Sequence, residues 1–175
     1  MRIDVLWRGL AGHPLHPPLT DATIGAYTAA TVLAFLDVVG LSDKAAAHGW
    51  WLALLVGLAF TVPTALTGLA DWLTIKWRSQ LWTATWHLAA MVSATIFFGV
   101  TAIVGHGDWQ RGNVTALPFA LNLIGFGLLT LGGWLGGSIV FVHGMRVLSL
   151  VDEPPQRAVS PLPKREKELA EKRAS

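Results

Sequence analysis

The sequence predicts an all-α integral membrane protein, built as an antiparallel bundle of four transmembrane helices. Hydrophobic residues make up 53% of its 175 residues and charged residues only 14%, well below the soluble average of about 25%. Four apolar runs reach the length of about 20 residues that spans a bilayer. They lack the polar stripe that a helix of a soluble bundle carries. The runs are residues 19–41, 50–73, 85–105 and 117–142.

The first two runs have distinct local signals. Run 19–41 begins too late, and behind too many prolines, for a cleaved signal peptide, so we expect a retained helix. Run 50–73 contains Pro63 among Thr61, Thr64 and Thr67. Threonine hydroxyls can bond the carbonyls that a proline leaves without a partner, so this run is predicted to stay helical with a kink.

The last two runs carry a histidine and a set of glycines. Run 85–105 has His87 near its start. Run 117–142 contains two small-xxx-small pairs, formed by Gly132, Gly133, Gly136 and Gly137. Such pairs allow helix backbones to approach closely. They predict packing within the chain, with a homodimer face or a wall against a planar cofactor as the alternatives.

Charge placement predicts the topology and the domain organisation. Eleven of the thirteen Lys and Arg residues precede the first run, follow the last one or lie between the second and third; the exceptions are Lys44 and Arg111. The positive-inside rule therefore places both termini in the cytoplasm. We expect an interfacial segment at 1–18, a membrane domain at 19–150 and a flexible charged tail at 151–175. No internal repeat is apparent.

The composition excludes several function classes. The chain has no cysteine, which excludes disulfides, thiolate ligands and c-type haem attachment. It has no basic stretch interleaved with aromatic residues, so nucleic acid is not an expected partner. It also lacks a phosphate loop, a carboxylate dyad or a recognisable nucleophile–base pair, so a stand-alone enzyme is not expected.

Four of the six histidines lie at run ends that share the cytoplasmic side of the predicted topology. They are His13, His16, His87 and His143, with Asp71 at the same side. Carboxylates in a membrane usually face water or a partner. Asp71 is therefore a candidate to orient a histidine ring, whereas Asp37, near the other surface, is expected to be solvated.

Two kinds of site would explain this clustering, and the sequence leaves both open beside a purely structural network. The first is a b-type haem for electron transfer, with His87 and His143 as the axial pair and His16 and His13 as further cofactor-binding residues. The second is a divalent metal bound by the four histidines together with Asp71. A structural or assembly subunit of a larger membrane complex is the remaining alternative.

Several of these residues occur in a pattern that resembles a known family. The elements are Gly12-His13-Pro14-Leu15-His16-Pro17, Gly25, Gly68-Leu-Ala-Asp71-Trp72, His87, Gly132-Gly133-Trp-Leu-Gly136-Gly137 and His143-Gly144. Together they resemble the bacterial membrane proteins with "domain of unknown function 2231" over about residues 9–148. The resemblance implies a four-helix protein of the bacterial inner membrane. It also implies redox work with a separate Rieske-type or cytochrome c partner, because such domains are fused to relatives.

Overall fold

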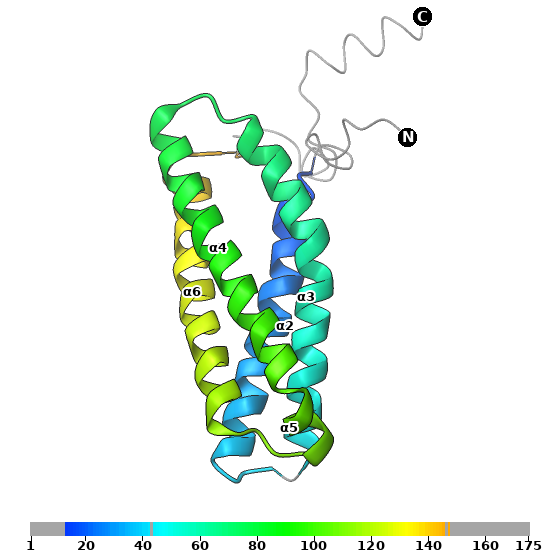
Figure 1. Ribbon diagram of the computed structural model, residues 1–175. Helices are drawn as coiled ribbons and strands as arrows, with labels where there is room; N and C mark the ends of the chain where they lie inside the picture. The colour runs from blue at the N-terminus through cyan, green and yellow to red at the C-terminus, as the bar shows by residue number, and fades with distance from the viewer. Residues whose placement is uncertain (1–12, 43, 146, 148–175) are drawn as a thin grey trace, which may run out of the picture.

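The computed structural model describes residues 13–42, 44–145 and 147, and this part of the chain is helical (Figure 1). The helices are α2 (His16–Val38), α3 (Lys44–Leu73), α4 (Arg78–Val104), the short α5 (His106–Arg111) and α6 (Ala116–Phe141). The four long helices are each long and apolar enough to cross a membrane. The predicted four-helix membrane bundle is therefore confirmed, whereas the predicted tail at 151–175 lies outside the described residues.

Three helices begin three or more residues before the apolar runs that predicted them. Helix α2 begins at His16, with Pro17 and Pro18 in its first turn. Proline is tolerated there because the first N–H groups of a helix have no intrahelical partner. Helices α3 and α4 begin at Lys44 and Arg78. Each extension begins with a charged residue or a histidine and contains further polar residues or prolines, so hydropathy did not reveal its full length.

The bundle consists of two helical hairpins. Helix α2 packs along α3, and α4 packs along α6, as Figure 1 shows. The hairpins meet through α3 and α4 on one side and through α2 and α6 on the other, which leaves α2 and α4 on one diagonal. Helices α2 and α4 begin at the same end, which we call the proximal end; the other is the distal end.

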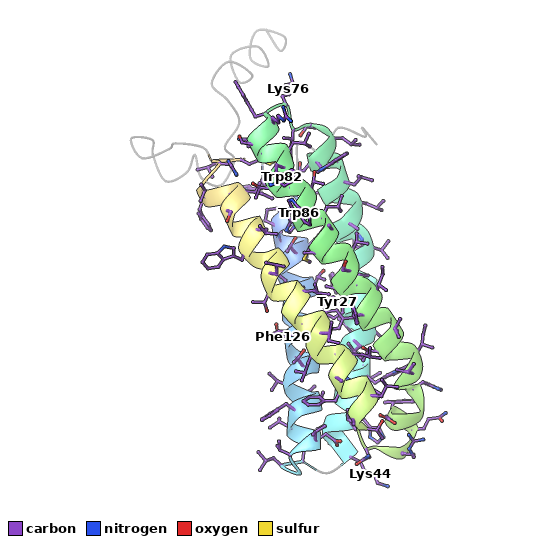
Figure 2. All side chains as sticks on the ribbon, turned by 60° about the vertical axis from the view of Figure 1, so that its left-hand side comes forward. Tyr27, Lys44, Lys76, Trp82, Trp86 and Phe126 are labelled. Carbon is purple, nitrogen blue, oxygen red and sulfur yellow. The ribbon has the colours of Figure 1, made fainter. Side chains whose placement is uncertain are left out.

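Large apolar side chains project outward from the bundle, and Figure 2 shows them along its length. Val62 and Ile103 are 61% and 77% exposed. Trp82 and Trp86 stand out near the proximal end with their rings edge to face. An apolar surface of this extent suits lipid rather than water. The chain is thus a multi-pass membrane protein.

Polar groups inside the bundle are paired. Thr61, Thr64 and Thr67 donate to the carbonyl oxygens four residues earlier, including that of Pro63. Helix α3 continues through Pro63, as predicted. The buried Asn122 accepts from Trp50 Nε1 and donates to Thr31 Oγ1. These bonds tie three helices together at a depth where an unpaired polar group would be costly.

The loop at the distal end is also fixed by carboxylates. Asp37 Oδ2 accepts the backbone N–H of Val114 at 2.7 Å, so the expectation that Asp37 is simply solvated is wrong. Asp108, which is 2% exposed, accepts both the N–H and the hydroxyl of Thr115. Both carboxylates accept backbone N–H groups that precede α6 and have no hydrogen-bond partner within that helix.

Candidate functional site

His16 opens α2 at the proximal end, and its ring lies against α3. Its Nδ1 is 3.0 Å from the carbonyl oxygen of Thr64, and the Thr67 hydroxyl lies 3.4 Å away. A carbonyl oxygen can only accept a hydrogen bond, so Nδ1 carries the proton. In the neutral ring, Nε2 therefore holds the lone pair that a metal would use.

His87 repeats this arrangement one hairpin away. It lies in α4, and its Nδ1 is 2.7 Å from the carbonyl oxygen of Gly132 in α6. By the same reasoning, Nδ1 carries the proton, and Nε2 of the neutral ring holds the lone pair that a metal would use. Metal-binding histidines are typically held in this way, by an Nδ1–H that donates to a backbone carbonyl or a carboxylate.

The two imidazoles meet across the hairpins. The ring centroids of His16 and His87 are 6.4 Å apart, with an angle of 87° between the planes. Each ring occupies space that a glycine leaves. A Cβ on Gly68 would lie 2.6 Å from Cε1 of His16, and a Cβ on Gly136 would lie 3.2 Å from Cε1 of His87.

His143, the other predicted axial ligand, is bonded to the first turns of α4. At the end of α6, its Nε2 lies 3.0 Å from the hydroxyl of Thr83, and its carbonyl oxygen accepts from Gln80 at 3.0 Å. These bonds fasten the end of α6 to the start of α4. The ring that meets His87 is that of His16.

The other predicted ligands are His13 and Asp71. His13 is exposed just before α2, and Asp71 is half-buried near the end of α3. The groups that orient the rings of His16 and His87 are helix carbonyls. In the part of the chain described here, no group of three or more His, Asp or Glu side chains is placed to hold a metal ion.

The glycines of α6 divide into two faces. Gly132 and Gly136 face α4, and a Cβ on Gly132 would lie 2.5 Å from Sδ of Met91. A homodimer face that includes these two glycines is therefore a wrong prediction, because they already pack within the bundle. Gly133 has open space where a Cβ would stand, so Gly133 and Gly137 remain the candidates for contact between copies.

A second cluster of rings lies at the distal end. Trp51 and Trp109 stack with centroids 4.8 Å apart, and His106 stacks on Trp109 at 5.5 Å. His48 meets Trp109 edge to face at 6.2 Å. The cluster depends on the short helix α5, which apolar periodicity did not reveal.

The fold and the site define a class: all-α, multi-pass membrane proteins with a histidine pair between two hairpins. A family model described as "Predicted membrane protein (DUF2231)" matches residues 12–149. The chain belongs to this family, as the resemblance of its motifs implied. No curated protein and no solved structure gave a match.

Proposed function

We propose that this protein binds a b-type haem through His16 and His87 and serves electron transfer. The observation that carries the proposal is the pairing of both Nδ1 atoms with helix carbonyls. This pairing leaves an Nε2 lone pair on each of two rings that come from different hairpins. Bis-imidazole ligation of haem iron needs two such nitrogens.

The spacing of the rings fits one shared metal atom. Two imidazoles bonded to the same metal at about 2 Å have ring centroids about 5–6 Å apart, depending on the angle at the metal, and the observed separation is 6.4 Å. The bundle also supplies the rigid hold that a ligand pair needs. Gly68 and Gly136 let each ring lie close to a helix backbone, and Thr64 and Gly132 fix its rotation.

The number of protein ligands at the site favours haem over a divalent ion without a porphyrin. A porphyrin fills four positions of its iron, so the protein has to supply only two ligands. A structural zinc ion takes four protein ligands, whereas the described residues offer no group of three. Haem would supply one-electron chemistry at this end of the bundle. The residues around it orient the two imidazoles.

The proposed setting is the bacterial inner membrane, with the histidine pair near the cytoplasmic leaflet. The excess of Lys and Arg in the terminal segments and in the loop between α3 and α4 supports this orientation. A separate redox protein of the Rieske or cytochrome c type would then exchange electrons with the site. An assembly role in a larger membrane complex is the alternative if no cofactor binds.

The test is the absorption spectrum of the protein purified from haem-replete cells. We expect a Soret band and, after reduction, the sharp bands of a low-spin b-type haem. His16→Ala and His87→Ala should each abolish the low-spin spectrum, whereas His48→Ala at the distal end should leave it unchanged. Circular dichroism would establish that each variant is folded.

Two outcomes would overturn the proposal. Folded wild-type protein without a Soret band would exclude haem, and elemental analysis of the same sample would then reveal any other metal. A low-spin spectrum that survives His16→Ala and is lost in His143→Ala would restore the pair predicted from the sequence.

A further inference from the structure

The first helices of the two hairpins correspond residue by residue. A shift of 71 positions carries His16 onto His87 and Tyr27 onto Phe98. The same shift matches the other buried positions of α2 with buried positions in or directly after α4. These matched positions are Thr23 with Ala94, Ala30 with Thr101, Thr31 with Ala102 and Ala34 with Gly105.

The second helices correspond under a shift of 68 positions. This shift carries Gly57 onto Gly125 and Gly68 onto Gly136. Two buried residues, Thr67 and Leu129, match the half-buried Leu135 and Thr61. Four other buried positions coincide: Trp50 with Pro118, Leu54 with Asn122, Gly57 with Gly125 and Thr64 with Gly132. Residue types differ at most of these positions while burial is kept. That is why no repeat is apparent in the sequence.

The arrangement in space has the matching symmetry. Helices α2 and α3 are neighbours as α4 and α6 are, and the contact of α3 with α4 has its counterpart in α6 with α2 (Figure 1). Because α2 and α4 begin at the same end, a two-fold axis that exchanges the hairpins runs along the bundle. It is therefore parallel to the membrane normal, as in other parallel membrane repeats.

Matched residues meet in pairs across this axis. His16 meets His87 at 6.4 Å, and Tyr27 stacks on Phe98 at 3.9 Å. Each hairpin brings the same unit to the histidine pair. The unit is an imidazole, a helix carbonyl that holds its Nδ1, and a glycine four residues after that carbonyl.

We infer that the bundle is a tandem repeat of one helical hairpin and that its histidine site takes a single metal centre, shared by equivalent imidazoles of the two repeats. Gly68 and Gly136 are the matched positioning residues of that site. The nature of the centre as haem iron rests on the proposed function. The repeat and the shared position of the two rings do not.

The absence of cysteine from the chain allows a test that needs no cofactor. In the double variant His16→Cys/His87→Cys, a short bifunctional thiol reagent should bridge the two sites within one chain, which intact mass would show. The pair His16→Cys/His106→Cys joins opposite ends of the bundle and should not bridge. Two reactive but unbridged thiols at 16 and 87 would overturn the inference, whatever the haem spectrum shows.

The positioning residues give a second test, in the haem-loaded protein. Gly68→Ala and Gly136→Ala should each weaken haem binding, by about tenfold or more in affinity where the ring has to move, and so lower haem occupancy. Gly68→Ala should have the larger effect, because its Cβ would lie closer to the imidazole. Gly25→Ala and Gly133→Ala are the matched controls, since nothing lies within 4 Å of either Cβ. Full occupancy in both site variants would overturn the positioning role and leave the proposed function standing.

A third test follows from the equivalence of His16 and His87 as ligands. His16→Met and His87→Met should produce the same change, a histidine–methionine spectrum and a higher midpoint potential. A change in only one of the two variants would show that the two ligands are not equivalent.

Discussion

Tyr27 and Phe98 stack in the middle of the bundle, with ring centroids 3.9 Å apart and planes within 10° of parallel. The rings come from diagonal helices and touch because each passes over a glycine. A Cβ on Gly57 would lie 2.5 Å from the Tyr27 ring, and a Cβ on Gly125 would lie 3.1 Å from the Phe98 ring. This contact joins α2 and α4, whose backbones do not pack directly against each other.

Removing this contact should destabilise the fold. Phe98 is fully buried, and truncation of a buried phenylalanine to alanine costs about 3–5 kcal/mol. We therefore expect Phe98→Ala to lower the free energy of unfolding in detergent micelles by that order. Phe60→Ala is the control, because Phe60 is 41% exposed on the outer face. Equal losses in the two variants would mean that the stack does not hold the hairpins together.

The bonds of Asn122 predict a coupling between helices. Asn122→Leu would leave Trp50 Nε1–H without its acceptor, and such a buried unpaired group costs about 1–3 kcal/mol. Trp50→Phe removes the donor, so the double variant should lose less than the sum of the two single ones. Interhelical bonds in membranes typically couple by about 0.6 kcal/mol, with a maximum near 1.7. Strict additivity in a double-mutant cycle would show that the bond contributes nothing.

The helical spans were predictable because a bilayer imposes length and composition directly, and each of the four runs lies largely within a helix. Other features had no such signal. The six residues of α5 are too few to show a period. Because the long helices are apolar on all sides, hydropathy does not indicate which faces pack. The proximity of His16 to His87 had no such signal either: depth could be estimated from the sequence, but the diagonal placement of α2 and α4 could not.

The two aspartates of α2 provide a matched pair for the distal loop. Asp37 accepts the N–H of Val114, whereas Asp21, near the other end of the helix, is exposed. Hydrogen bonds to charged groups are worth about 1.5–3 kcal/mol. Asp37→Ala should cost about that much stability and speed amide hydrogen exchange at Val114, and Asp21→Ala should change neither. Unaltered exchange at Val114 in Asp37→Ala would argue against the bond.

Replacing Gly132 or Gly133, which are adjacent in α6, by a large residue should affect the stability of the fold differently. At Gly132 even a methyl group would approach Sδ of Met91 to 2.5 Å, so Gly132→Ile should separate α4 from α6 and destabilise the monomer by more than about 1–3 kcal/mol. Gly133→Ile points into open space and should leave stability unchanged.

If copies associate through Gly133 and Gly137, Gly133→Ile should weaken that association, measured by energy transfer between labelled chains in lipid vesicles. Association that is unaffected by Gly133→Ile would exclude this face, because an isoleucine prevents the close backbone approach that small-xxx-small contacts require.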